Sequence, residues 1–522
     1  MIFANDYCKI FSVIIIIKGF WYKIQYNFIS MKAENKTYYY ISILIIIITS
    51  FLLYSSNFYP LLNSDDALNI LMAHYYKLPN DIYCWGQDRG GTLIPLISQV
   101  FIKIFGLSAL TSVSISNYLI LVLGYFGFSS LFKTNYSKIL FGIIWFLPFQ
   151  RFIDILRFPI GVEYSLIGIV IFLINKLELC NNFNKHVLLI SIVILLITTV
   201  WVSDLAIITI GLLLITLIVF GYIKDKKLIR DKTYIYYMFL GVILGFIFIQ
   251  FAKTNATVKT NNYISINGFY DIKAALILLG KSFIEVLTFR TNEIFVSVYT
   301  YLVFAFIIAS IIFIIKKKLL LNIISNKWIV FFTLDFLAIL GTIILSSWVL
   351  SNGMGRWYFV ASYISLSLVI LLSIEHIDKI CSIKSLKLSL IIIVAIGAIS
   401  PIYAMNFYRP KTLKPMVDVV GEFQQLGKIG VIAEFWNSYI VSCTNPELIV
   451  ATPHDKSDVR SPKLVNKVFE RENLYVIKDM WMNSFPDTLE QFGYTLKKEG
   501  NPFKLGGCDV CKYHKVDFKH IN

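Results

Sequence analysis

Long apolar runs separated by short polar segments fill the chain from residue 38 to about residue 405. A helix of about twenty apolar residues spans about 30 Å of hydrocarbon, so each long run predicts one membrane-spanning helix. We expect about eleven such helices, the third of them completed by the residues that flank its apolar run. The expected spans lie near 38–56, 108–131, 139–150, 160–175, 187–203, 205–222, 233–252, 292–315, 327–348, 357–374 and 388–405.

Two further apolar segments predict helices that lie on the membrane surface rather than cross it. Leu93–Phe105 is too short to span the hydrocarbon and carries Lys103. Between residues 272 and 286 the apolar positions recur every three or four residues, which is typical of an amphipathic helix at the lipid interface. These positions are Ile272, Ala275, Leu276, Leu279, Phe283 and Val286.

The residues before the first span predict a cytoplasmic N-terminal segment, 1–37. Its apolar run, Val13–Ile17, lies between Lys9 and Lys18 and is too short to span the membrane. No small-residue cleavage site follows the run, so it is a poor match to a signal peptide. Met31 stands just before the first span and is a plausible translation start, with residues 1–30 an upstream extension or a disordered tail.

The chain becomes polar and proline-containing after Met405. Short runs rich in β-forming residues at 429–435, 447–451 and 474–477 predict strands, and helical patterns lie between them. The fold class expected is therefore a polytopic α-helical membrane domain at 38–405 followed by a small α/β domain at 406–522. The Cys508 and Cys511 pair predicts a disulfide, and Cys84 with Cys443 is a second candidate pair.

Composition supports a membrane protein and suggests its orientation. Of 522 residues, 57% are hydrophobic and only 15% are charged, well below the charged share of soluble domains. The net charge of +16 could indicate nucleic acid, but no basic run is interleaved with aromatics as in known nucleic-acid modules, so we expect no nucleic-acid partner. Basic segments at 224–232, 316–318 and 379–387 predict cytoplasmic turns, which places the C-terminal domain outside.

On this topology the outer loops collect the residues that could carry chemistry. Two adjacent carboxylates, Asp65 and Asp66, follow the first span, where charge near lipid is costly and is often retained for function. The alternative is a solvated loop whose carboxylates only cap a helix that starts near Ala67. The other candidates are Trp85, Asp88 and Arg89 in the first loop, Arg151, Asp154 and Arg157 in the second, and Arg356, Trp357 and Tyr358 in the fifth.

These residue types suit transfer of a group from a lipid phosphate. A carboxylate such as Asp65 or Asp66 can take the proton of an acceptor hydroxyl. Arginines can bind two phosphate oxygens with one planar guanidinium, which suggests Arg89 and Arg356 and, as further candidates, Arg151 and Arg157. With one of the acidic pair, Asp154 is a candidate ligand for a divalent metal, Mg or Mn. The alternative for Arg356, Arg151 and Arg157 is that each anchors a helix end at the lipid headgroups.

The pattern resembles the polyprenyl-phosphate-sugar-dependent glycosyltransferases of the GT-C fold, the class that contains protein mannosyltransferases and the aminoarabinose transferase of lipid A. The resemblance rests on Asp65 and Asp66 after the first span, on Arg356-Trp357-Tyr358 at the start of a late span, and on Gly430–Trp436 as the opening strand of an outer domain. In that class a second acidic residue often lies in the second outer loop. Asp154 is the match here, with Glu163 as the alternative.

The resemblance implies an enzyme of the bacterial cytoplasmic membrane that uses a polyprenyl-phosphate-linked sugar. The acceptor it implies is a lipid-linked glycan, such as O-antigen or lipopolysaccharide, or another envelope molecule. It also implies that Trp85, Asp88, Trp357 and Tyr358 contact substrate. The alternatives are a glycan polymerase of the O-antigen type and a transporter or flippase, for which the only sign is Asp335 within an apolar span.

Overall fold

The computed structural model describes residues 36–157, 159–177, 183–225, 233–256, 265–291, 293–378, 380, 383–408 and 415–516. The expected N-terminal segment up to residue 35 and the basic residues at 226–232 lie outside the described residues. Within the described chain, ten helices are long and apolar enough to cross a membrane, and a bent pair supplies an eleventh. The prediction of about eleven spans is confirmed.

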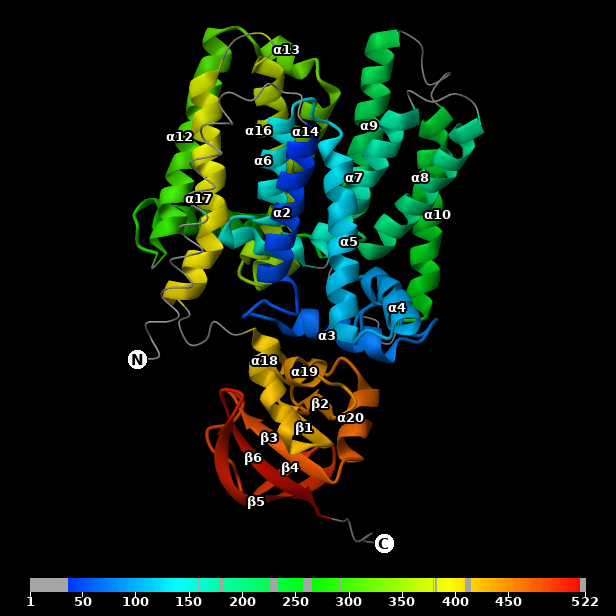
Figure 1. Cartoon of the computed structure of the whole chain (residues 1–522), viewed down its shortest axis with the longest axis vertical. Helices are drawn as coiled ribbons and strands as arrows, with labels where there is room; N and C mark the ends of the chain where they lie inside the picture. The colour runs from blue at the N-terminus through cyan, green and yellow to red at the C-terminus, as the bar shows by residue number, and fades with distance from the viewer. Residues whose placement is uncertain are drawn as a thin grey trace.

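The spans run side by side in one bundle, and the C-terminal domain lies at one end of it (Figure 1). The single-helix spans are α2 (Lys36–Tyr54), α5 (Ala109–Ser129), α7 (Ile160–Leu177), α8 (Phe183–Val202), α9 (Ala206–Asp225), α10 (Thr233–Thr254), α12 (Ile294–Lys316), α14 (Lys327–Leu345), α16 (Val360–Asp378) and α17 (Lys384–Tyr408). The short helices α13 (Leu320–Ile324) and α15 (Ser347–Ser351) and the 3₁₀ turn η2 (Arg356–Phe359) lie between the later spans.

The third span is bent, which corrects the single helix predicted near 139–150. Helix α6 (Asn135–Phe146) ends before Pro148, and the chain resumes as the 3₁₀ helix η1 (Gln150–Leu156) at an angle of 92°. Proline disfavours helical backbone in the residue before it, and Leu147 has left the helix with φ −127° and ψ 59°. The bend turns the second outer loop back over the bundle, where it meets other loops.

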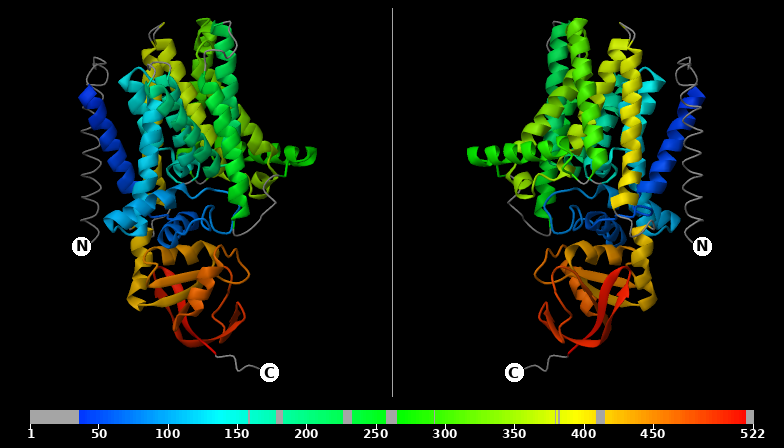
Figure 2. Two further views of the ribbon diagram at one scale, coloured as in Figure 1. Left: turned by 90° about the vertical axis from the view of Figure 1, so that its right-hand side faces the viewer. Right: turned by 90° about the vertical axis from the view of Figure 1, so that its left-hand side faces the viewer.

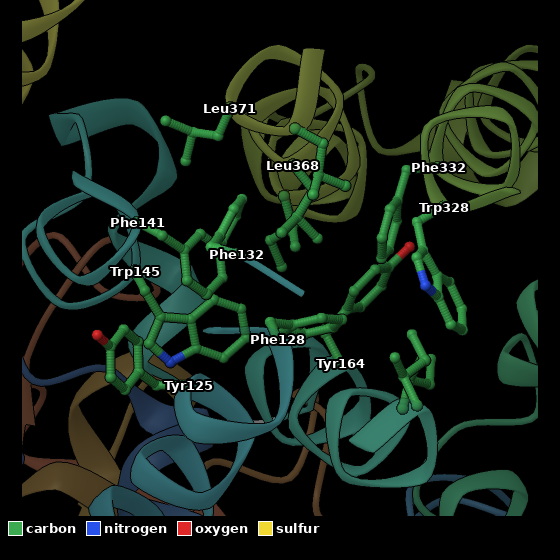
Figure 3. Packing of buried hydrophobic residues seen from close by; sticks show 14 of the residues in the cluster. Tyr125, Phe128, Phe132, Phe141, Trp145, Tyr164, Trp328, Phe332, Leu368 and Leu371 are labelled. Carbon is green, nitrogen blue, oxygen red and sulfur yellow. The ribbon is translucent and has the colours of Figure 1, made fainter. Parts of the chain in front are cut away.

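Aromatic side chains fill the centre of the membrane domain (Figure 3). Phe128 of α5 has its ring centroid 5.7 Å from that of Trp145 of α6 and 5.9 Å from that of Phe332 of α14. Helices α5 and α7 approach closely because small residues face each other, and a Cβ on Gly124 would lie 2.4 Å from Ser165. This packing holds rigidly the helices from which the outer loops emerge.

Asp335 lies fully buried in α14, and the structure identifies the partners that the sequence left unnamed. Its carboxylate accepts hydrogen bonds from Tyr164 Oη at 2.7 Å, Thr209 Oγ1 at 2.7 Å and Ser365 Oγ at 2.5 Å. These hydroxyls come from α7, α9 and α16, so one carboxylate joins four spans. Buried polar groups with such partners stabilise a unique packing, which is a structural role.

The two surface helices are present as predicted. Helix α4 (Leu93–Phe105) is apolar but too short to cross the membrane and lies beside α3 (Ser64–Tyr75), between the bundle and the C-terminal domain (Figure 1). Helix α11 (Phe269–Leu287) lies across the direction of the spans and projects from the bundle (Figure 2). Its exposed apolar side chains include Leu276 and Ile284, as expected for a helix at the lipid interface.

The C-terminal domain is a six-stranded mixed sheet in the order β2-β1-β3-β6-β5-β4. The predicted strands are confirmed as β1 (Ile429–Ala433), β2 (Ile449–Pro453) and β3 (Asn473–Lys478), which are parallel to one another. The sequence analysis did not predict the antiparallel strands β4 (Thr488–Gln491), β5 (Tyr494–Leu505) and β6 (Cys508–Lys515). The helical elements are α18 (Met416–Gly421), η3 (Glu422–Leu426), α19 (Phe435–Cys443) and α20 (Pro462–Phe469).

The C-terminal domain packs directly on α3, and the two share one continuous buried core. Ser64 Oγ donates to the Phe435 carbonyl at 2.8 Å, and Tyr75 Oη donates to the Pro446 carbonyl at 2.9 Å. Apolar residues of α3, among them Leu71, belong to the same core as the buried strands of the sheet. The domain is therefore joined to the first outer loop rather than tethered beside it.

The cysteine predictions are wrong. Cys84, Cys443, Cys508 and Cys511 are all free thiols. Cys508 and Cys511 lie three residues apart in β6, where the extended backbone places them roughly 10 Å apart, on opposite faces and beyond the reach of a disulfide.

Candidate active site

The acidic pair begins a helix, but it does not cap it. Helix α3 starts at Ser64, and its N-cap is Asn63, whose side chain accepts the backbone N–H of Asp66 at 2.8 Å. The helix is therefore capped by Asn63, and not by the carboxylates as the alternative prediction had it. Asp65 and Asp66 lie in its first turn, where the partial positive charge of the helix N-terminus favours negative groups.

Asp66 starts a row of alternating charges that crosses three loops. Its Oδ2 lies 3.4 Å from Nε of Arg157, and Nη1 of Arg157 lies 3.9 Å from Oδ1 of Asp154. Oδ2 of Asp154 in turn accepts a hydrogen bond of 2.6 Å from Nη1 of Arg356. The row Asp66–Arg157–Asp154–Arg356 joins α3, the end of η1 and η2, so the first, second and fifth loops meet, which the proposed chemistry requires and the sequence alone could not show.

Arg157 is the most enclosed member of this row. Its side chain is 12% exposed, and Nη2 donates to the Leu61 carbonyl at 3.4 Å. The guanidinium carbon lies 4.4 Å from the centre of the Tyr59 ring, a cation–π contact. These four contacts indicate that Arg157 holds the loops together, a role closer to that of a structural anchor than to that of an open phosphate ligand.

Asp65 differs from its neighbour because its carboxylate has neither a hydrogen bond nor an ion pair within the described part of the chain. The side chain is exposed to solvent, yet the surrounding protein removes enough water that desolvation raises the pKa of Asp65. Arg460, Arg157 and Arg89 oppose this shift through their positive charges. An open carboxylate with a raised pKa is what a general base requires.

The loop that carries Arg89 is fixed by backbone and indole contacts. Trp85 is 7% exposed, and its Nε1 donates to Asp81 Oδ1 at 2.8 Å. The Gly91 N–H donates to the Trp201 carbonyl at 2.9 Å, and a Cβ at Gly91 would collide with that tryptophan. Trp85 therefore stabilises this loop, and its contact with substrate stays a prediction.

Arg89 also lies against the fifth outer loop. Its guanidinium carbon lies 5.4 Å from the centre of the Trp348 ring in α15, which supports a cation–π contact. Asp88 neighbours Arg89 in the first loop, whereas Trp357 and Tyr358 lie in η2, with the Trp357 side chain 46% exposed. The structure brings the aromatic residues of η2 to the Arg356 end of the charge row, and their contact with substrate stays a prediction.

An apolar cavity of about 370 Å³ opens inside the membrane domain between α6, η1, α12, α14, α16 and α17. Among the described residues that line it, Arg151 alone is charged. The Arg151 side chain pairs with Glu293 at 2.8 Å, and the Arg151 carbonyl accepts Nη1 of Arg356 at 3.0 Å. Arg151 thus lines the cavity and contacts the charge row through its backbone carbonyl.

Arg460 is a site residue that the sequence analysis missed. It belongs to the turn before α20 in the C-terminal domain, and its Nη1 donates to the Gly86 carbonyl at 3.2 Å in the first outer loop. No motif surrounds Arg460 in the sequence. Only the packing of the C-terminal domain on α3 brings it close to Asp65.

The predicted metal ligands fit a metal ion poorly. Asp154 and Asp66 are both paired with arginines, which competes with metal binding. In the described chain no group of three or more His, Cys, Asp or Glu side chains is placed to hold a metal ion. Glu163, the alternative acid, is buried in α7 away from the charge row and bonded to Ser203. Dependence on Mg or Mn stays a prediction, which removal of metal with EDTA would test.

Comparison with known proteins gives structural but not sequence matches. No protein-family model matches the chain, and no curated protein matches it. The chain is similar to ArnT from Cupriavidus metallidurans bound to undecaprenyl phosphate, with 9% identity and a TM-score of 0.45, over 92% of this chain and 98% of that one. It is also similar to the oligosaccharyltransferase AglB from Archaeoglobus fulgidus in complex with an inhibitory peptide and a dolichol-phosphate, with 10% identity and a TM-score of 0.42, over 85% and 69%.

These similarities lie in the architecture of most of the chain, where the sequence analysis placed the resemblance to the GT-C class. Identities near 10% and TM-scores below 0.5 add nothing on substrate, acceptor or catalytic residue.

Proposed function

We propose that this protein transfers a sugar from a polyprenyl-phosphate-linked donor to a lipid-linked glycan or another envelope acceptor at the outer face of the bacterial cytoplasmic membrane. The observation that carries the proposal is the junction of three features in one place. An apolar cavity within the membrane domain is lined by Arg151, the Arg151 carbonyl contacts a row of partly buried charges, and an open carboxylate lies beside that row.

The cavity suits the donor. Its apolar lining and its volume of about 370 Å³ suit part of a prenyl chain, which passes from the bilayer hydrocarbon into a similarly apolar site. Arg151 at the mouth and Arg356 beside it can bind the phosphate oxygens, and the planar guanidinium matches phosphate geometry. Their positive charge also stabilises the phosphate as it departs.

The open carboxylate suits the acceptor step. Asp65 takes the proton of the acceptor hydroxyl while that oxygen forms a bond to the anomeric carbon of the sugar. The bond between the anomeric carbon and the phosphate oxygen breaks, and the electron pair leaves with the polyprenyl phosphate. Attack opposite the leaving group inverts the anomeric centre. Asp66 is less suited to this step because it is paired with Arg157.

The distribution of lysines supports an outer location for the site. Lys316–Lys318 and Lys384 lie at the end of the bundle opposite the C-terminal domain (Figure 1), and basic turns mark the cytoplasmic side of a membrane protein. A reporter fused after residue 408 should therefore be found outside the cytoplasm, and a cytoplasmic signal would contradict this orientation.

Singly substituted variants test the proposed base. Asp65→Asn should lower the rate of sugar transfer from a polyprenyl-phosphate sugar by roughly 10²-fold or more, the usual contribution of a general base. Asp66→Asn should lower it less, because it weakens an ion pair without removing the base. Transfer is measured with purified protein in lipid vesicles, and Asp487→Asn, at a side chain 97% exposed, is the control.

Full transfer activity in Asp65→Asn would reject Asp65 as the base. A glycan polymerase would instead lengthen a lipid-linked glycan without consuming a monosaccharide donor, and a transporter would move its substrate without forming a glycosidic bond. Asp335, the residue that suggested transport, is held by three hydroxyls and supports neither alternative.

A further inference from the structure

Arg460 spans the boundary between the C-terminal domain and the first outer loop. Besides its bond to the Gly86 carbonyl, its guanidinium carbon lies 5.4 Å from the centre of the Phe435 ring. Its backbone N–H donates to Tyr439 Oη at 2.8 Å, which fixes the turn that carries it. Contacts at both ends of the residue leave the side chain only 16% exposed.

Gly86 is required for this contact. It has a φ of +67°, and a Cβ there would lie 2.8 Å from Cδ of Arg460 and 3.0 Å from its Cα. The glycine therefore provides both the left-handed backbone of the turn and the space that the arginine fills. The first outer loop and the C-terminal domain fit together at this residue.

The arginine retains unused hydrogen-bonding capacity. Its Nε is buried and has no hydrogen-bond partner among the described residues. Its one ion pair, to Asp458 at 3.6 Å, involves a carboxylate that is 79% exposed, where such pairs contribute little. A buried, undersatisfied guanidinium is costly to maintain for packing alone, since an apolar residue could fill the same space.

The turn that carries Asp65 and the side chain of Arg460 both contact Phe435. Ser64, the neighbour of Asp65, donates to the Phe435 carbonyl, and Arg460 lies over the ring of that phenylalanine. Arg460 is also the cation with the largest electrostatic effect on Asp65, ahead of Arg157 and Arg89. The turn that carries Asp65 and the guanidinium of Arg460 therefore both lie against Phe435 at the domain boundary.

We infer that Arg460 is a positioning residue of the active site: its bond to Gly86 holds the loop that carries Arg89, and its guanidinium on the Phe435 ring places a positive charge beside the turn that carries Asp65. The C-terminal domain thus completes the site rather than accompanying it. The inference rests on the proposed function for its kinetic test, but the effect of the charge on Asp65 can be measured separately.

The direction of the effect follows from the groups around Asp65. Burial raises the pKa of Asp65, whereas Arg460, Arg157 and Arg89 lower it. Asp66 is the neighbouring negative charge, and the half-buried Cys84 thiol also lies within electrostatic reach. Replacing Arg460 with a neutral side chain removes the strongest of the three opposing cations, so the pKa of Asp65 rises.

The kinetic test compares Arg460→Gln with Arg460→Lys. In Arg460→Gln, the acidic limb of kcat/KM against pH should move upward by roughly half a pH unit or more, the expected effect of a unit charge nearby. Arg460→Lys keeps the charge, so its limb should stay in place even if its maximal rate falls. Arg471→Gln is the control, because Arg471 of the same domain bonds the Glu447 carbonyl at an exposed site.

A second measurement needs no activity. Carbodiimides label protonated carboxyl groups, so the pH dependence of Asp65 labelling, followed by mass spectrometry of intact membranes, reports its ionisation directly. The labelling curve should move to higher pH in Arg460→Gln and not in Arg460→Lys or Arg471→Gln.

An unchanged labelling curve in Arg460→Gln would overturn the inference. A shifted curve in a protein with no transfer activity would instead support the inference and reject the proposed function. Full transfer activity in Asp65→Asn would reject Asp65 as the base and leaves the labelling curve as the measure of the inference, so the two failures are distinguishable.

Discussion

Two adjacent aspartates on one helical turn have different environments. Asp66 is 13% exposed and paired with Arg157, whereas Asp65 is open and unpaired within the described chain. The sequence predicted the pair but left open which aspartate is the base, because adjacent residues of a helix point in directions about 100° apart and only the packing around the helix decides what each one meets.

The environment of Asp65 predicts a conflict between activity and stability. Because its pKa is raised in the folded protein, the folded state binds more protons than the unfolded state between the two pKa values, and stability falls as the pH rises through that window. The deficit grows as the pH rises through that window. Asp65→Asn should therefore raise the melting temperature at pH 7 while lowering the rate of transfer, and the gain should shrink as the pH falls toward the ordinary pKa of a carboxyl group.

Thermal unfolding in detergent between pH 4 and pH 8 measures this difference against the wild-type protein. Asp487→Asn, at an exposed side chain, should show no gain at either end of the range. A lower melting temperature for Asp65→Asn at pH 7 would mean that the ionised carboxylate stabilises the fold.

At the scale of the element, the bend between α6 and η1 determines the site. The apolar pattern predicted a span near 139–150 but could not predict a turn of 92° after Phe146. Pro148 was the available signal, since proline interrupts helices, although a proline such as Pro401 also occurs inside the continuous helix α17. The bend carries Arg151, Asp154 and Arg157 over the bundle, so each of these second-loop residues meets another element.

Arg157 holds the first and second loops together through its contacts with Asp66 and Asp154. Arg157→Lys replaces a forked guanidinium with one ammonium that cannot reach Asp66, Asp154 and the Leu61 carbonyl together. We expect the free energy of unfolding to fall by roughly 2 kcal/mol, a value below that for a buried pair that loses one partner entirely.

Arg151→Lys is the matched control, measured by the same chemical unfolding experiment. Its ion pair with Glu293 involves side chains that are 37% and 30% exposed, and such pairs contribute about 0–1 kcal/mol. Equal losses of stability in the two variants would contradict the anchoring role of Arg157.

At the scale of the whole molecule, the shared core makes the C-terminal domain part of the fold. Apolar residues of α3 and α4 belong to one buried cluster with the strands of the sheet. The sequence predicted the domain and its first three strands, because their short β-rich runs are buried and nearly continuous. It did not predict β4, β5 and β6, where charged and apolar residues mix on an exposed antiparallel surface.

The shared core predicts that the membrane domain is not stable alone. A chain that ends after residue 408 would expose the face of α3 on which α19 rests, in a helix whose Ala67 and Leu71 are both fully buried. We expect such a chain to be degraded or to unfold well below the melting temperature of the full-length protein. Membrane abundance and size-exclusion profiles measure this, and a truncated chain with unchanged stability would contradict the shared core.

The helices could be predicted from sequence patterns, whereas the contacts of the candidate site could not. The spans follow from the length of the apolar runs, and the two surface helices follow from a short run and from apolar periodicity. All of these are local properties of the chain. The charge row and the Arg460 contact join residues separated by up to several hundred positions, and single charged residues in polar loops carry no periodic signal. The predicted disulfides failed for the related reason that the number and spacing of cysteines do not report distance in space.

The order of these residues along the chain has a consequence for biosynthesis. The first carboxylates emerge early, Arg157 and Arg356 emerge later, and Arg460 emerges only after the last span has been inserted. A nascent chain therefore carries the acidic turn before any of these three arginines has been added. The contact between Gly86 and Arg460 can form only after all the described spans have been made, so the two halves of this boundary meet late in synthesis.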